Sequence, residues 1–188
     1  MNPPSSSKWI CCKPPRPEAK LRLFCLPWAG GNSTAFNRWR DLPAEVEVCA
    51  VELPGRMSRR AEPLLESVHE TVAQLAAALN AGGFLRDSSR PFALFGHSLG
   101  ALVAFELARV LVTKYGAQPL RLIVSGARPP DQEQTGGGGG GGGGMPVSEL
   151  PRDDLVAYLV AKGGIPAQLA EEREVLDFYL PPIRADYM

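Results

Sequence analysis

The chain has 188 residues, of which 45% are hydrophobic, and it carries 20 basic residues against 20 acidic ones. This length supports one hydrophobic core and is too short for two well-formed domains. The balanced charge gives no electrostatic feature typical of proteins that bind nucleic acid or an anionic membrane surface. The sequence holds no membrane-length apolar run and no secretory signal, so we expect a soluble cytoplasmic protein. A transit signal to an organelle, in the Ser-rich start with Arg16 and Lys20, is the alternative.

The first part of the chain predicts two strands and two loops. Residues 1–20 are rich in Pro, Ser and Lys, and we expect an irregular N-terminal arm there. Apolar and polar residues alternate over 21–26 before Pro27, and an apolar run covers 46–53, so both segments are predicted strands. The segment 56–60 carries three arginines and is predicted to be a solvated loop.

The middle of the chain predicts alternating helices and strands. Apolar residues recur three and four positions apart from 65 to 79, which indicates an amphipathic helix with His69 at the boundary of its apolar face. The run at 92–95 predicts a strand, 99–111 a helix, and 119–126 a further strand. This alternation implies right-handed crossovers and a parallel sheet, hence the α/β class.

The residues Gly96-His97-Ser98-Leu99-Gly100 lie between a predicted strand and a predicted helix. A G-x-S-x-G motif in this context forms a sharp turn that holds its Ser in a strained backbone conformation at the top of the sheet. The two glycines leave room for the neighbouring strand and helix. We therefore interpret Ser98 as a nucleophile.

A second glycine-rich loop, 27–32, directly follows the first predicted strand. Gly30 and Gly31 allow backbone amides to point at a ligand, as an oxyanion hole requires. An ordinary glycine-rich turn is the alternative. The Ser98 motif further along the chain favours the oxyanion loop.

The composition changes after Ala127. Nine consecutive glycines at 136–144 cannot bury a core, and we expect this insert to be disordered. Beyond it, 152–162 and 167–180 are predicted helices. The region 127–180 is interpreted either as a lid whose apolar underside suits an acyl chain, or as helices packed on the sheet face.

The cysteines and histidines do not predict a metal site. Cys11 and Cys12 are adjacent, which suits neither a loop-closing disulfide nor a zinc site, and no C-x-x-C motif occurs. Cys25 and Cys49 lie in apolar strands and are predicted to be buried small residues. With only two histidines in the sequence, we expect neither a metal nor a cofactor.

Five short motifs together carry a family resemblance. They are Leu-Pro-Trp-Ala-Gly-Gly (26–31), Glu-Leu-Pro-Gly-Arg (52–56), Gly-His-Ser-Leu-Gly (96–100), Ser-Gly-Ala-Arg-Pro-Pro (125–130) and Leu-Pro-Pro-Ile-Arg-Ala-Asp-Tyr (180–187). In order and spacing they resemble type II thioesterases, the stand-alone enzymes similar to those acting beside polyketide synthases, non-ribosomal peptide synthetases and animal fatty acid synthase. The resemblance covers nearly all of 21–188 and implies an α/β-hydrolase fold with a mostly parallel sheet and a helical lid.

The resemblance implies that Ser98 attacks an acyl thioester on the phosphopantetheine arm of an acyl carrier protein, or an acyl-CoA. The oxyanion would be held by the backbone amides of Ala29 and Leu99. We expect a monomer without a cofactor. A carboxylesterase or lipase on the same fold is one alternative, and a pseudoenzyme that binds a carrier protein without turnover is another.

The acid and the histidine of the triad follow the lid in the family, the histidine near the C-terminus. Neither His69 nor His97 matches that position, and we expect the His97 side chain to point away from the nucleophile into the packing of strand and helix. Asp131 is a candidate acid, at the place used by some synthase-embedded thioesterases. We therefore expect a fragment that lacks the last strands and helix, leaves the 120–125 strand with an unpaired edge, and is inactive or nearly so alone.

Overall fold

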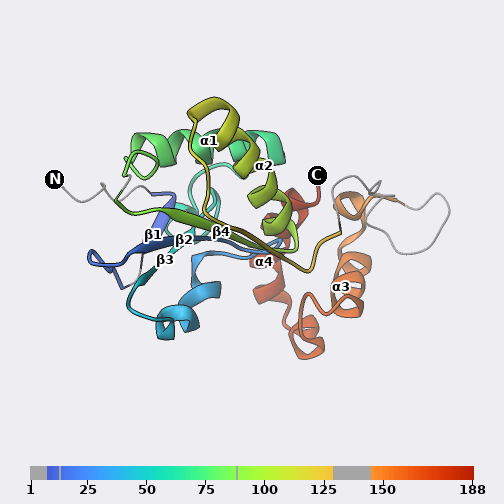
Figure 1. The fold of residues 1–188 in the computed structure, drawn as a ribbon. Coiled ribbons are helices and arrows are strands. Elements are labelled where there is room, and N and C mark those ends of the chain that lie inside the picture. The colour runs from blue at the N-terminus through green and yellow to red at the C-terminus, as the bar shows by residue number, and fades with distance from the viewer. Residues whose placement is uncertain (1–7, 13, 88, 129–144) are drawn as a thin grey trace.

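A computed structural model describes residues 8–12, 14–87, 89–128 and 145–188 (Figure 1). Its centre is a five-stranded sheet of order β1-β3-β2-β4-β5, in which only β1 is antiparallel to its neighbour. The strands are β1 (Ile10–Cys12), β2 (Leu21–Leu26), β3 (Val46–Val51), β4 (Phe92–His97) and β5 (Leu122–Ser125). The predicted α/β class with a mostly parallel sheet is therefore confirmed.

The described residues also form four α-helices and four 3₁₀ segments. The α-helices are α1 (Val68–Ala81), α2 (Leu99–Tyr115), α3 (Arg152–Ala161) and α4 (Arg173–Asp186), and the 3₁₀ segments are η1 (Ser33–Asp41), η2 (Met57–Arg59), η3 (Val147–Glu149) and η4 (Ala167–Glu171). Helix α1 begins at Ser67, whose hydroxyl caps the Glu70 amide, and α2 ends at Gly116 in the left-handed conformation.

Apolar side chains form separate clusters on the two faces of the sheet and a third cluster around α3 and α4. Helices α1 and α2 cover one face, where Phe24, Leu94 and Leu107 are fully buried (Figure 1). On the other face, Cys25 packs with Phe36 of η1. The cluster of α3 and α4 is centred on residues such as Leu155 and Leu176 and is distinct from the sheet core. These two helices thus share an apolar cluster of their own, and the interpretation of 127–180 as a lid stays a prediction.

The N-terminal arm departs from expectation. Ile10–Cys12 form β1, which pairs antiparallel with β3, so the prediction of an irregular arm over 1–20 is wrong for these residues. Trp9 and Ile10 are 5% and 6% exposed and belong to the sheet core. Burial of these two apolar side chains outweighs the polar composition around them.

The arginine segment is also not a solvated loop throughout. Arg56 and Arg59 are 5% and 3% exposed, whereas Arg60 is exposed. Arg59 donates to the Glu52 carbonyl and to the Glu62 carboxylate, and its guanidinium lies over the Trp9 ring. A guanidinium can be buried when its donors and its charge find partners, and Glu52 and Glu62 supply them for Arg59.

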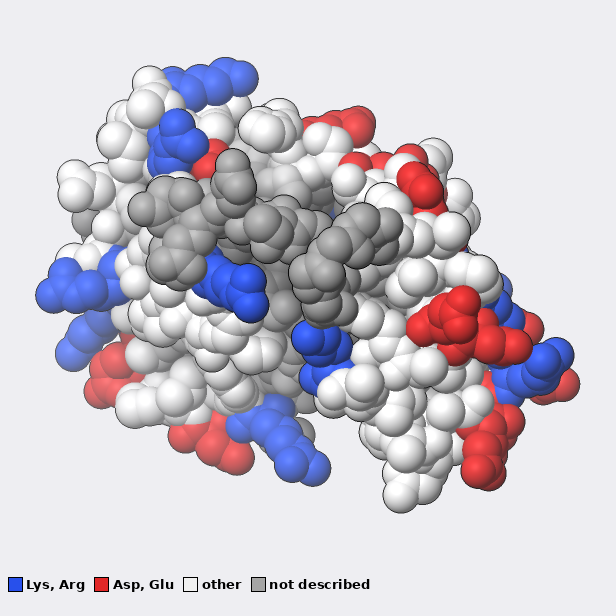
Figure 2. All heavy atoms as spheres, turned by 90° about the vertical axis from the view of Figure 1, so that its right-hand side faces the viewer, with Lys and Arg blue, Asp and Glu red and all other residues white. Residues whose placement is uncertain are grey.

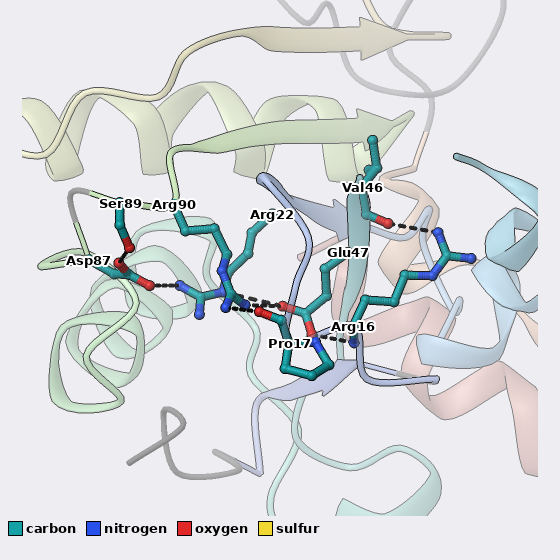
Figure 3. Close-up of polar contacts among 8 residues, drawn as sticks. All are labelled: Arg16, Pro17, Arg22, Val46, Glu47, Asp87, Ser89 and Arg90. Atoms are coloured by element: carbon teal, nitrogen blue, oxygen red, sulfur yellow. Dashed lines mark hydrogen bonds and ion pairs between the residues drawn. The ribbon is translucent and has the colours of Figure 1, made fainter. Parts of the chain in front are cut away.

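Buried charges form a network at the amino end of the parallel strands (Figure 3). The carboxylate of Glu47 on β3 accepts from the Arg16 amide, from Arg22 on β2 and from Arg90. Arg22 also pairs with Asp87, and its side chain is 1% exposed. The network therefore joins β2, β3 and the turn that leads into β4.

Strand β5 lies at the end of the sheet, and all four of its residues are exposed. Ile123 and Val124 are 46% and 56% exposed. Among the described residues β5 pairs only with β4, as expected for an unpaired edge. The nine glycines at 136–144 and the candidate acid Asp131 lie outside the described residues.

We predict that Glu47→Gln lowers the free energy of unfolding by about 3 kcal/mol, because it removes the buried carboxylate charge that pairs with Arg22 and Arg90. Urea unfolding followed by circular dichroism measures the change. The control is Glu45→Gln, which alters an exposed carboxylate two residues away. Equal stabilities of the two variants would contradict a stabilising role for the network.

We predict that Val124→Lys slows aggregation on heating, measured by light scattering, because a charge on an exposed edge strand opposes the addition of further strands. Val112→Lys is the matched control, since Val112 is an exposed valine on α2 rather than on a sheet edge. If both variants slow aggregation equally, the unpaired edge is not its cause.

Candidate active site

Ser98 occupies the sharp turn between β4 and α2. Its backbone has φ 54° and ψ −120°, a region that L-residues rarely adopt, so the predicted strain at this residue is confirmed. The Ser98 amide donates to the Ser125 carbonyl of β5 over 2.8 Å, and the Ser98 carbonyl accepts from Ala101. Such a conformation costs on the order of 1–3 kcal/mol and persists only where its surroundings hold it.

The two glycines of the motif are required by space. A Cβ on Gly96 would lie 2.0 Å from the Gly100 carbonyl oxygen. A Cβ on Gly100 would lie 2.3 Å from the Leu26 carbonyl oxygen, at the end of β2. The predicted close approach of strand and helix is therefore present, and any side chain at either position would force the turn apart.

The sheet register brings the 27–32 loop next to Ser98. Strands β2 and β4 are parallel neighbours, with Leu26 opposite Gly96. The loop after β2 and the turn after β4 therefore leave the sheet side by side at the same edge. Two segments about seventy residues apart, which were predicted separately from the sequence, lie together in the fold.

The amides of Ala29 and Leu99 at this edge have no hydrogen-bond acceptor among the described residues, and the same holds for Trp28, Asn32 and Gly100. The two loop amides that follow Ala29 are engaged. Gly30 donates to the Asp186 carboxylate over 2.7 Å, and Gly31 donates to the Trp28 carbonyl over 2.8 Å. The amides available for an oxyanion therefore include the two that were predicted for that role.

Asp186 and Arg56 form an ion pair behind this loop that the sequence analysis did not identify. Arg56 donates to the carboxylate oxygen that also accepts from Gly30, and the two side chains are 4% and 6% exposed. Burial raises the pKa of the Asp186 carboxyl, while Arg56 and the Gly30 amide act in the opposite direction. Both residues lie in the five motifs that carry the family resemblance, which was the only available signal.

Neither histidine is hydrogen-bonded to Ser98. The Nδ1 atom of His97 lies 3.1 Å from the Ser125 hydroxyl of β5, and the ring meets Trp28 edge-on. Its contacts are thus with strand β5 and the loop after β2. His69 is exposed in the first turn of α1. Asp131 lies outside the described residues, so its role as an acid stays a prediction.

Three potential metal ligands do come together, away from Ser98. Ligand atoms of Cys12, Glu47 and Cys49 lie within 4.8 Å of one another. Both oxygens of Glu47 already accept hydrogen bonds, from the Arg16 amide and from Arg22 and Arg90 (Figure 3). A hydrogen bond with Cys12 and burial raise the pKa of Cys49, which disfavours a thiolate. This set is poorly suited to a cation.

The face of the molecule on the α3 side carries both basic and acidic side chains (Figure 2). A small cavity of about 30 Å³ lies between α1, α2 and α4, and both Leu99 and Asp186 contribute to its lining. It is far smaller than the roughly 300–1,000 Å³ typical of small-molecule sites.

The helices in the described part of the chain are all too short or too polar to span a membrane.

Comparison with known proteins gives a consistent family. A model of the thioesterase domain matches residues 21–188. Thioesterase PikA5 of Streptomyces venezuelae is 37% identical over 183 residues, which cover 97% of this chain and 60% of that protein. The medium-chain S-acyl fatty acid synthase thioesterase of Anas platyrhynchos is 42% identical over 173 residues, which cover 91% of this chain and 64% of the relative.

A solved structure agrees with these sequence matches. The type II thioesterase BorB from the borrelidin biosynthetic cluster has a TM-score of 0.77 and 40% sequence identity, covering 95% of this chain and 68% of BorB. The chain spans less than two thirds of the length of each of the two sequence relatives above. The chain belongs to the thioesterase domain family, and it has the α/β-hydrolase fold of the type II thioesterases.

Proposed function

We propose that this chain carries the nucleophile and the oxyanion loop of an enzyme that hydrolyses acyl thioesters. The main support is the strained Ser98 beside the amides of Ala29 and Leu99, which lack acceptors among the described residues. The family match also supports it, as do the names of PikA5 and of the fatty acid synthase thioesterase of Anas platyrhynchos. The proposed substrate is an acyl group on the phosphopantetheine arm of a carrier protein, or an acyl-CoA.

The reaction proceeds in two steps. The Ser98 hydroxyl attacks the carbonyl carbon and gives its proton to a base, while the developing oxyanion accepts from Ala29 and Leu99. The C–S bond then breaks, and the proton passes to the departing thiolate. In the second step water attacks the acyl-serine, the carboxylic acid is released, and the free serine is regenerated.

The base that would take the Ser98 proton has no candidate among the two histidines of this chain. The sequence contains two histidines, and neither is bonded to Ser98. Loss of the triad histidine lowers kcat by about a million-fold in subtilisin. We therefore propose that these 188 residues alone turn over acyl thioesters at a rate close to zero. A cytoplasmic location and a monomeric state are part of the proposal.

The lack of a histidine bonded to Ser98 also favours a second function. A thioesterase domain whose serine has no partnered base could bind an acyl carrier protein without turnover. This alternative predicts that affinity for the carrier protein survives Ser98→Ala and is not accompanied by acylation of the chain. A carboxylesterase on the same fold differs only in its leaving group.

We predict that free imidazole allows S-hexanoyl-pantetheine to acylate Ser98, because imidazole supplies the missing base. Intact-protein mass spectrometry measures the added acyl group, and peptide mapping locates it. Ser98→Ala should abolish the modification. Ser58→Ala, which changes an exposed serine in η2, should leave it unchanged.

Three results would contradict the proposal. Acylation at the same rate in Ser98→Ala would remove Ser98 as the nucleophile. A clear preference for the oxygen ester of the same acyl group would favour a carboxylesterase over a thioesterase. Carrier-protein binding with no acylation, in both the presence and the absence of imidazole, would favour the non-catalytic alternative.

A further inference from the structure

One carboxylate at the end of α4 contacts two segments near the proposed oxyanion site. The Oδ2 atom of Asp186 accepts from the Gly30 amide over 2.7 Å and from the Arg56 guanidinium. Arg56 also donates to the Pro54 carbonyl over 3.3 Å and to the Pro182 carbonyl of α4 over 3.5 Å. The pair thus joins the loop after β2, the loop after β3 and helix α4.

These contacts determine the orientation of the peptide groups on both sides of Ala29. The Trp28 carbonyl and the Ala29 N–H belong to one planar trans peptide, so they point in opposite directions. The Gly31 amide holds that carbonyl, and Asp186 holds the Gly30 N–H of the next peptide. The Ala29 N–H is consequently directed away from the Trp28 carbonyl and keeps no acceptor among the described residues.

The loop and the helix are also in tight steric contact. Gly30 has φ +73°, and a Cβ there would lie 2.2 Å from Cγ1 of Ile183 on α4. Asp186 and Leu99 line the same small cavity. The carboxylate is therefore close to both segments that supply the proposed oxyanion donors.

The charges of the pair depend on each other. The side chains of Arg56 and Asp186 are 4% and 6% exposed, so either charge alone would be buried without a partner. The Nε atom of Arg56 is buried without a hydrogen-bond partner in the described structure. The protein thus buries an ion pair even though one arginine donor has no partner among the described residues. One carboxylate oxygen of this pair accepts from the Gly30 amide of the loop, which points to a role beyond packing.

We propose that Asp186, supported by Arg56, is a positioning residue that holds the 27–32 loop so that the Ala29 amide faces the reacting carbonyl. This inference rests on the function proposed above. Asp186 does not contact substrate in this scheme. It acts through the Gly30 amide, and removing it should loosen the loop and weaken the stabilisation of the oxyanion.

Three variants of the 188-residue chain test the proposal. Asp186→Asn keeps an acceptor oxygen for Gly30 and removes the charge. The double variant Arg56→Met with Asp186→Leu removes both charges and the acceptor, and substitution of a buried ion pair by apolar residues of similar volume often preserves folding. Asp177→Asn is the control, because Asp177 is an exposed carboxylate on the same helix.

The first measurement is amide hydrogen exchange at Gly30 by nuclear magnetic resonance, with folding checked by thermal unfolding. We expect Gly30 exchange to rise on the order of tenfold or more in the double variant and to stay near that of the parent chain in Asp177→Asn. Asp186→Asn should show a smaller rise, because it keeps the acceptor oxygen but leaves the buried Arg56 charge unpaired. Unchanged exchange at Gly30 in a folded double variant would overturn the proposal.

The second measurement is the rate of imidazole-dependent acylation of Ser98 by S-hexanoyl-pantetheine. We expect the double variant to be slower by up to about a hundredfold, the lower end of the effect of losing one oxyanion donor, and Asp186→Asn to recover most of the rate. Equal rates in the parent and the double variant would overturn the positioning role. Absence of acylation in the parent chain would instead contradict the proposed function, while Gly30 exchange would still decide whether Asp186 holds the loop.

Discussion

The parallel pairing of β2 with β4 is the contact on which the site depends. Because Leu26 lies opposite Gly96, the two strands end together and their following loops share one edge of the sheet. The Gly100 position then has no room for a Cβ, since the Leu26 carbonyl would lie 2.3 Å away. The strained turn at Ser98 and the glycine-rich loop are thus parts of one close contact, and moving either strand by one residue would displace the Ala29 amide relative to Ser98.

Most of the fold could be predicted because its signals are local. The alternating pattern of β2, the apolar run of β4, the helical spacing of α1 and the glycines around Ser98 each depend on a few neighbouring residues. The turn conformation followed from the same residues, because only glycine tolerates the approach of strand and helix. The positions of Ala29 and Leu99 came from the family resemblance, and their lack of acceptors is consistent with it.

The parts that could not be predicted depend on partners far along the chain. The Pro- and Ser-rich composition around β1 gave no sign that Trp9 and Ile10 are buried against the sheet. A cluster of arginines is usually solvated, and nothing near Arg56 in the sequence indicates that its carboxylate partner is Asp186. Neither histidine is hydrogen-bonded to Ser98 in the described structure, since His97 is engaged with Ser125 and His69 is exposed on α1.

The bond between Gly30 and Asp186 joins residues that are 156 positions apart. During synthesis on a ribosome, β2, β4 and the turn at Ser98 can assemble before α4 has emerged. The glycine-rich loop can reach its final arrangement only after Asp186 has left the exit tunnel. The 27–32 loop is therefore completed later than the strained turn at Ser98, because its Gly30 amide needs a partner from α4.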